Sequence, residues 1–265
     1  MRSSRVDDDG DHWRGSKPMK TARRRPLQRM QETTSRDDGR DPHPLMLTAG
    51  WCSTAIRPLA TSLVTGANRG IGLAYCQQLH TRGDKVIAVC RQSSDELDAL
   101  GVRVESGIEL TSPDSIAALV NGLAGQQLDT VILNAGILQS MGLSDLDPDG
   151  IRQQFEVNAL APLLLARALI PLMPEGSKLV LMTSRMGSIE DNSSGGSYGY
   201  RMSKVALNIV GKSLAVDLQS QGIAVAILHP GLVKTRMIRF NPNGISPEDS
   251  VNGLIARIDE LTLEN

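Results

Sequence analysis

The sequence predicts an α/β domain: one doubly wound parallel sheet flanked by helices. From residue 61 onward, short apolar segments of strand length alternate with longer segments of helical pattern. Such alternation implies right-handed crossovers between parallel strands. The strand segments are apolar at nearly every position, which is typical of strands buried on both faces.

The first half of this domain surrounds a glycine-rich turn. A strand at 61–65 leads into the turn at 66–72, and a helix follows to about Arg82, where Gly83 is a natural stop. The next predicted elements are strands at 85–90, 101–108 (weakly patterned) and 128–133, and a helix at 112–123 with Pro113 in its first turn.

The second half continues the alternation. A long helix is predicted at 149–172, with a kink at Pro162. Ser246 and Asp249 cap the last helix, which ends near Leu261. Between these two helices lie a strand at 178–183, a helix at 197–220, a strand at 223–228 and an irregular segment rich in Lys, Arg, Asn and Pro.

Composition favours one large domain with an appendage. The chain has 265 residues, of which 40% are hydrophobic and only 3% aromatic, so we expect an aliphatic core and an aliphatic substrate pocket. Residues 1–58 carry 12 Lys/Arg against 8 Asp/Glu, and the remainder carries 16 against 21. These charges indicate no nucleic-acid-binding domain.

Residues 1–58 are expected to be a disordered extension of a domain at 59–265. They are polar, aperiodic and interrupted by Pro and Gly. Three alternatives stay open. The first is an organellar presequence, although the acidic cluster at 7–11 argues against it. The second is a basic tail that touches acidic lipid or nucleic acid. The third is a natural start further in, such as Met46.

Cysteine usage and hydropathy favour a cytoplasmic protein. Cys52, Cys76 and Cys90 show neither metal-ligand spacing nor an even disulfide set, which fits a reducing compartment. The apolar stretches are too short or too interrupted to span a membrane. We therefore expect no metal site and no membrane partner.

Ligands of doubly wound sheets bind beyond the carboxyl ends of the strands. Here those ends carry the glycine turn, Arg91, 134–136, Ser184 and 230–231, which are expected to share one edge. Glycine admits positive φ and lets a phosphate approach the backbone, and the helix that follows offers free N–H groups. A glycine-rich turn alone is a weak signal, and 134–136 could be only a turn.

Tyr200 and Lys204 are the most informative pair in the chain. Residues four apart share a helix face, so the Lys204 ammonium is expected near the phenol. A free phenol ionises near pH ~10, a nearby cation lowers that pKa, and such a tyrosine exchanges a proton with substrate near neutral pH. The alternative is a partly buried aromatic and a solvated lysine. Tyr198 has no lysine four residues on and is expected to line the pocket.

Together, these motifs resemble the short-chain dehydrogenase/reductase family, which implies a Rossmann-type sheet. Residues 183–189 and 197–204 resemble the sniffer-type and C-factor-type carbonyl reductase branch. Relatives usually have a seventh strand, which is expected to be missing here and to leave a sheet edge open. The matching motifs, in family order over 59–261, are Thr65-Gly-Ala-Asn-Arg-Gly-Ile-Gly72, Asn134-Ala-Gly136, Asn158, Ser184, Tyr200-x-x-x-Lys204 and Pro230-Gly231.

The resemblance implies a role for each catalytic candidate. Tyr200 would be the general acid/base that protonates the carbonyl oxygen, and Lys204 would lower its pKa and hold the nicotinamide ribose. Ser184 would hydrogen-bond the same oxygen, and Asn158 would support a water chain to Lys204. Without the resemblance, Ser184 could be a turn serine at a strand end, and Asn158 could cap or kink its helix.

The resemblance also implies a nicotinamide cofactor, and two arginines favour NADP over NAD. An NAD site usually has an acidic residue at the end of the second strand, where this chain has Cys90 and Arg91. A guanidinium suits a 2′-phosphate, and Arg69 is a second cation, although both arginines could be merely solvated. The implied cofactor-binding residues are Gly66, Asn68, Arg69, Gly70, Ile71, Gly72, Arg91, Glu109, Leu110, Asn134, Ala135, Gly136, Tyr200, Lys204, Pro230, Gly231, Val233 and Thr235.

The expected function is hydride transfer between NADP(H) and a small, fairly apolar carbonyl or alcohol, in a homodimer formed through the two long helices. Residues 190–196 are expected to form a mobile loop at the pocket mouth. Alternatives are a non-catalytic dinucleotide-binding regulatory or signalling protein and a 3-oxoacyl thioester reductase of the same fold. Flexible pocket residues that would permit loose specificity are Met141, Met186, Met237 and Ile238.

Overall fold

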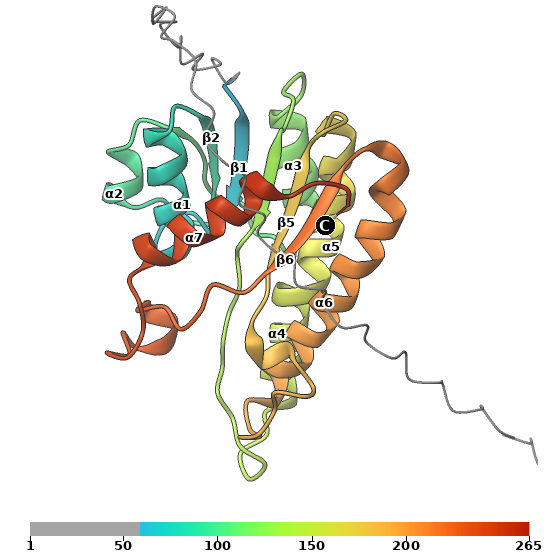
Figure 1. Cartoon of the computed structure of the whole chain (residues 1–265). Coiled ribbons are helices and arrows are strands. Elements are labelled where there is room, and N and C mark those ends of the chain that lie inside the picture. Colours follow the sequence, from blue (N-terminus) through green and yellow to red (C-terminus); the bar gives the residue numbers. More distant parts are fainter. Residues whose placement is uncertain (1–58, 265) are drawn as a thin grey trace, which may run out of the picture. The chain divides into compact units, whose positions relative to one another are not determined.

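A computed structural model describes residues 59–264 (Figure 1). The extension expected at 1–58 lies outside these residues. Six parallel strands form one sheet in the order β3-β2-β1-β4-β5-β6, so the order reverses between β1 and β4. The strands are β1 (Thr61–Thr65), β2 (Lys85–Val89), β3 (Arg103–Glu105), β4 (Thr130–Leu133), β5 (Lys178–Met182) and β6 (Ala224–Leu228).

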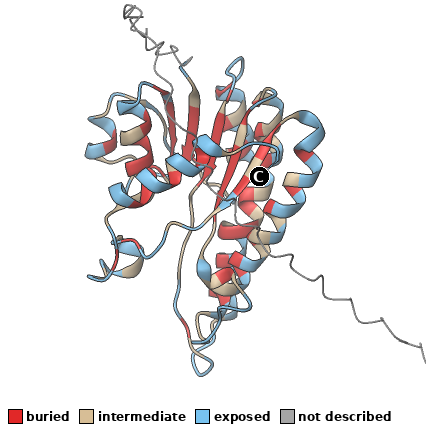
Figure 2. Cartoon of the chain, in the orientation of Figure 1, coloured by how far each residue is buried: buried red, intermediate tan, exposed pale blue. Residues whose placement is uncertain are grey.

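Helices cover both faces of this sheet (Figure 2). The helices α1 (Gly70–Thr81) and α7 (Pro247–Glu260) pack together over one face. The other face carries α3 (Pro113–Gly122), α5 (Ala161–Leu169) and α6 (Tyr198–Leu218). Shorter elements are α2 (Asp95–Asp98), α4 (Pro148–Phe155), η1 (Glu156–Leu160), η2 (Ile170–Leu172), η3 (Arg185–Gly187), η4 (Gln219–Gln221) and η5 (Arg236–Ile238).

Successive residues of the central strands feed two separate apolar clusters. In β1, the side chain of Leu63 joins the cluster under α3, α5 and α6, and that of Val64 joins the cluster under α1 and α7. Both side chains are fully buried. The doubly wound parallel sheet predicted from the apolar strand segments is therefore confirmed.

The helix predicted at 149–172 is one continuous helical segment of four parts: α4, a π-helical turn at η1, α5 and a 3-10 turn at η2. Pro162 has no N–H, so the Asn158 carbonyl has no α-helical donor four residues on. The expected kink is thus a π turn centred on Asn158, a feature common at functional sites.

The same segment, Pro148–Leu172, is the one helix within 59–264 that is long and apolar enough to cross a membrane. Only its length and mean hydropathy give it this property, and a buried core helix has the same length and hydropathy. Leu165, Ala166 and Leu169 belong to the apolar cluster beneath the sheet. The segment therefore has a packing role in this domain.

The remaining predicted elements occur where the sequence places them, with two differences. The third strand is only Arg103–Glu105, and α2 was not expected; Ser94 begins it by accepting a hydrogen bond from Leu97 N at 3.2 Å. Between residues 59 and 264 no seventh strand is formed, so β6 lies at the sheet edge.

Candidate active site

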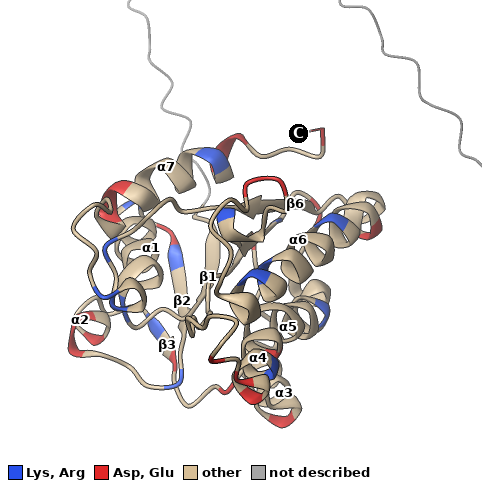
Figure 3. Cartoon of the chain, turned by 90° about the horizontal axis from the view of Figure 1, so that it is seen from below, with Lys and Arg blue, Asp and Glu red and all other residues tan. Residues whose placement is uncertain are grey.

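The four catalytic candidates meet beyond the carboxyl ends of the strands, the side of the domain shown in Figure 3. Ser184 lies two residues after β5, Asn158 lies in the π turn, and Tyr200 and Lys204 lie in the first two turns of α6. The Ser184 hydroxyl lies near enough to the Tyr200 hydroxyl to influence its pKa. Tyr200 and Lys204, four residues apart on α6, therefore lie beside Ser184 at the end of β5, as the sequence predicts.

Tyr200 is buried, with 8% of its surface exposed. Burial raises the pKa of its hydroxyl, and the nearby Ser184 hydroxyl opposes that rise. The net direction is upward because desolvation is the largest effect on this group. The Lys204 ammonium lies over the ring, 5.7 Å from its centroid, and its expected lowering of this pKa stays a prediction.

Lys204 is a buried cation, with 4% of its surface exposed. Its Nζ donates a hydrogen bond to the carbonyl oxygen of Met182 at 2.8 Å. Burial lowers the pKa of the amine to about 8. Lys204 is therefore mainly protonated at neutral pH, and it changes charge just above neutrality.

Asn158 is fully buried and joins the end of β4 to α6. Its Nδ2 donates to Ile137 O at 2.8 Å and to Ser203 Oγ at 3.0 Å, and its Oδ1 accepts from Ile137 N at 2.8 Å. Ser203 was not singled out from the sequence, although it directly precedes Lys204. The Asn158 amide therefore links the segment after β4 to α6, and its water chain to Lys204 stays a prediction.

The glycine turn packs closely on residues 134–136. A Cβ on Gly66, which has a φ of 66°, would lie 2.9 Å from Ala135 Cα. A Cβ on Gly72 would lie 2.2 Å from Gly66 O and 2.8 Å from Asn134 Nδ2. Only glycine fits these positions, so the two motifs form one unit in the structure.

Thr65 completes this unit, a role that was not predicted from the sequence. Its buried Oγ1 accepts hydrogen bonds from the backbone N–H groups of Asn134 at 3.0 Å and Ala135 at 3.1 Å. Asn134 Nδ2 donates in return to Thr65 O at 3.0 Å. The position of Thr65 directly before the first glycine is the sequence feature that could have indicated this role.

The amino end of α1 fits a phosphate group. Arg69 is its N-cap and makes no side-chain capping bond, and the first turn has no acidic residue. Its first N–H groups therefore have no side-chain cap and suit an anion. Thr235 lies close by, because a Cβ on Gly70 would be 3.2 Å from its Cγ2.

The two arginines expected at the 2′-phosphate are exposed, and one already has a partner. Arg91 Nη1 lies 3.6 Å from Glu109 Oε2, an ion pair that was not predicted from the sequence. Arg69 projects from the glycine turn into solvent. In Figure 3, basic segments gather beside α1, β2 and β3.

The other expected cofactor residues have mixed surroundings. Leu110 packs against the apolar core, Val233 is buried and bridges to Ile245, and Pro230 O accepts a hydrogen bond from Ser250 Oγ at 2.7 Å. The remaining ones are Asn68 and Ile71, which are half-buried within the glycine turn, and Gly231, which is exposed after the end of β6 with a φ of 84°.

The expected pocket residues differ in exposure. Met141 is buried, Met186 and Ile238 are half-buried, and Met237 is exposed. The loop at 190–196 is exposed over most of its length, but Arg201 ties it to α6 through several hydrogen bonds. Its mobility stays a prediction.

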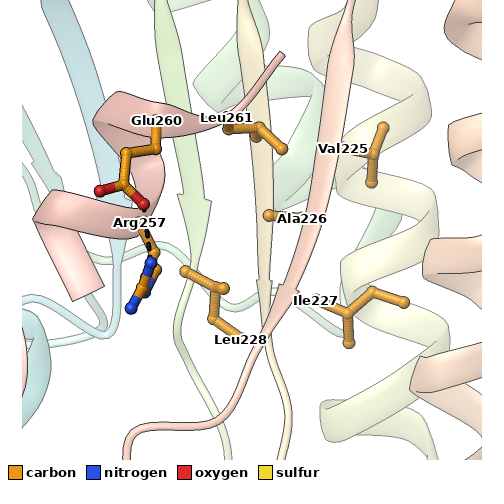
Figure 4. Close-up of a pocket in the computed structure, with 7 residues that line it drawn as sticks. All are labelled: Val225, Ala226, Ile227, Leu228, Arg257, Glu260 and Leu261. Carbon is orange, nitrogen blue, oxygen red and sulfur yellow. Dashed lines mark hydrogen bonds and ion pairs between the residues drawn. The ribbon is translucent and has the colours of Figure 1, made fainter. Parts of the chain in front are cut away.

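One cavity of about 360 Å³ lies away from these residues, along the edge strand β6 (Figure 4). Arg257 and Glu260 of α7 form an ion pair of 2.7 Å on its wall. None of the four catalytic candidates lines it. The described residues also contain no group of three or more His, Cys, Asp or Glu side chains that could hold a metal ion. The lining residues are Val225, Ala226, Ile227, Leu228, Arg257, Glu260 and Leu261.

Comparison with known sequences identifies the family of the chain. The sequence model of the short chain dehydrogenase family matches residues 60–244. A 1-hydroxy-2-glutathionyl-2-methyl-3-butene dehydrogenase from Rhodococcus sp. (strain AD45) is 44% identical over 211 residues, 78% of this chain and 93% of that protein. The C-signal protein of Myxococcus xanthus is 39% identical over 142 residues, 52% of this chain and 84% of that protein.

Solved structures of this family share the fold. The NADPH-bound carbonyl reductase from chicken fatty liver has a TM-score of 0.70 and 28% identity, over 78% of this chain and 93% of that one. The carbonyl reductase Sniffer of D. melanogaster has a TM-score of 0.71 and 28% identity, over 78% and 94%. These likenesses confirm the expected branch. The chain therefore belongs to the short-chain dehydrogenase family of oxidoreductases.

Proposed function

We propose that the protein is an NADPH-dependent carbonyl reductase that also runs in the alcohol-oxidising direction. One observation carries this proposal: a buried phenol, a nearby hydroxyl and a buried cation (Tyr200, Ser184 and Lys204) converge beyond the strand ends, near the glycine turn. A carbonyl reduction requires a proton donor, a hydrogen-bond donor to the developing oxyanion, and positive charge nearby.

The chain's own residues fit a dinucleotide phosphate. The glycines of the turn leave room for close approach, and the uncapped amino end of α1 offers N–H donors. Arg69 and Arg91 would hold the 2′-phosphate that distinguishes NADP from NAD. The NADPH bound to the chicken carbonyl reductase supports this choice. When bound, NADPH supplies the hydride.

Tyr200 acts as the acid in this mechanism. Its hydroxyl gives a proton to the substrate oxygen, and Ser184 donates a hydrogen bond to the same oxygen. Because burial raises the pKa of Tyr200, the phenol stays protonated at neutral pH and is a competent acid for reduction. Alcohol oxidation needs the phenolate, so we expect that direction to be favoured by alkaline pH. Lys204 provides positive charge beside the ring.

The test is the oxidation of NADPH by a panel of aldehydes, ketones and 3-oxoacyl thioesters. Tyr200→Phe should lower kcat by about 10²- to 10⁴-fold, the usual contribution of general acid catalysis, and should leave NADPH binding intact. Tyr198→Phe is the matched control, because Tyr198 is more exposed and has no lysine four residues on. Equal activities of the two variants would contradict the proposal. The signalling alternative predicts that Tyr200→Phe keeps its function in cells.

A second candidate substrate is an alcohol that carries a glutathionyl group, as the name of the Rhodococcus relative suggests. The segment after β6 exposes Lys234, Arg236 and Arg239. A glutathionyl group carries carboxylates, which such cations attract. Oxidation of a glutathione-conjugated alcohol with NADP and with NAD tests this candidate. No turnover with either cofactor would remove it.

The expected homodimer is also a proposal, with the cytoplasm as the expected location. Met202, Val205, Ile209 and Val216 are exposed apolar residues along α6, and Leu164 lies exposed on α5. An apolar stripe of this kind on neighbouring helices is suited to a two-fold interface. Sedimentation of the wild type and of an Ile209→Glu variant would distinguish a dimer from a monomer.

A further inference from the structure

One arginine fastens the segment between Ser184 and Tyr200, and the proposed mechanism does not use it. Arg201 Nε and Nη2 donate to the carbonyl oxygens of Gly195 and Gly196 at 3.2–3.3 Å. Nη2 also donates to Ser194 Oγ at 2.8 Å. A single guanidinium therefore joins three consecutive loop residues to the first turn of α6. Its planar set of donors suits several acceptors at once.

The loop takes a shape that depends on outside bonds. Gly195, Gly196 and Ser197 have φ values of 62°, 63° and 48°, so three consecutive residues are left-handed. This conformation is unfavourable for Ser197, which has a Cβ. Strained backbone persists where surrounding contacts determine it. The bonds from Arg201 are such contacts.

The fastened loop in turn contacts the segment before α4. Ser197 N donates to Met141 O at 2.7 Å, and the hydroxyls of Ser140 and Ser197 lie 3.3 Å apart. The Met141 side chain is 4% exposed. Figure 1 shows the segment before α4 and the segment before α6 together at the lower end of the domain, beyond the strand ends. Arg201 therefore acts, through Ser197, on the position of Met141.

Ser184 is fastened by a different residue. Thr183 Oγ1 and Asn208 Oδ1 are 2.5 Å apart, and Asn208 Nδ2 donates to Gly187 O at 3.2 Å. These bonds hold both sides of Ser184 against α6 without Arg201. The one bond from Arg201 to this part, to Met186 O, is long at 3.4 Å. Loss of Arg201 should thus release the loop and leave the catalytic hydroxyls in place.

We propose that Arg201 is a specificity-determining residue, which holds the loop at 190–197 against Met141 and so sets the size of substrate that reaches Tyr200. The inference rests on the proposed function, because it assigns the loop to the substrate side of that site. It predicts a separation of effects. Loss of Arg201 should change KM and the discrimination among carbonyls more than it changes kcat.

The kinetic test compares Arg201→Gln with wild type on small and branched ketones. Arg201→Gln should raise KM about 10-fold or more for the better substrate and reduce the preference between the two, since misplaced positioning groups cost up to about 10²-fold. The Kd for NADPH and the pH profile of kcat should stay unchanged. Arg201→Lys, which keeps a cation but not the planar donors, should lie between. Lys212→Gln, an exposed cation on the same helix, is the matched control.

A second measurement does not depend on activity. Glu190 is exposed in the loop, and cleavage after it by a glutamate-specific protease should be faster in Arg201→Gln than in wild type or Lys212→Gln. If Arg201→Gln does not fold, Gly195→Ala replaces it. A Cβ there meets nothing within 4 Å, but the left-handed backbone disfavours alanine, so this variant also loosens the loop.

The outcomes separate the two proposals. An active wild type with unchanged KM and selectivity in Arg201→Gln would overturn the inference and leave the proposed function standing. Faster cleavage with unchanged kinetics would also overturn it, because the tie would then be structural only. A wild type that reduces no carbonyl would overturn both proposals. Faster cleavage together with lost selectivity would support both.

Discussion

Replacement of Lys204 by methionine should abolish activity and yet stabilise the fold at neutral pH. Lys204 is 4% exposed, and burial lowers the pKa of its amine from 10.5 to about 8. One pKa unit corresponds to about 1.4 kcal/mol, so burial of the charged amine costs about 3 kcal/mol of folding free energy at pH 7. Methionine has a similar length and no charge, and it removes this cost.

The pH dependence isolates this effect from the lost hydrogen bond to Met182 O. Between pH 8 and 10.5 the unfolded chain holds the Lys204 proton and the folded chain does not, so the stability that this group contributes rises with pH. The difference in unfolding free energy between wild type and Lys204→Met should therefore change by about 2 kcal/mol between pH 7 and about 9.5, in favour of wild type.

Urea unfolding at the two pH values measures this difference. Lys212→Met, on the exposed face of the same helix, serves as control and should run parallel to wild type. Parallel profiles for Lys204→Met and wild type would refute the reasoning, because they would mean that the buried amine keeps an ordinary pKa. A loss of activity without a change in the pH dependence of the unfolding free energy would mean that Lys204 is needed for catalysis but is not desolvated.

Two further predictions concern packing and cofactor choice. Gly199→Ala should lower the unfolding free energy by about 1–3 kcal/mol in a thermal unfolding assay. The reason is that its Cβ would lie 2.6 Å from Gln154 Nε2 and 3.1 Å from Ile151 Cα. Gly253→Ala in α7 is the control and should stabilise slightly, because its Cβ meets nothing within 4 Å. Loss of stability in both variants would contradict this reading. Glu109→Gln frees Arg91 from an exposed ion pair and should tighten NADPH binding by no more than about 5-fold. Titration at low and high salt measures it, and weaker binding would show that Glu109 itself contacts the cofactor.

The fold was predictable because its elements carry local signals. The strand at 61–65, the proline at the start of α3 and the Ser246 cap were all placed correctly from neighbouring residues alone. The π turn at Asn158 was only partly predictable. Pro162 indicated a disturbance of the helix, but its form depends on the bonds from the Asn158 side chain to Ile137 and Ser203.

The sequence by itself determined the order of strands and helices, the glycine turn, and the placement of Ser184, Tyr200 and Lys204 beyond the strand ends. Short-range periodicity and parallel topology suffice for these features. Only the tertiary structure decided that burial raises the pKa of Tyr200, that Glu109 pairs with Arg91, and that Arg201 fastens the loop at 190–197. Desolvation and ion pairing depend on distances between residues that are remote in the chain, and those distances exist only after the helices pack on the sheet.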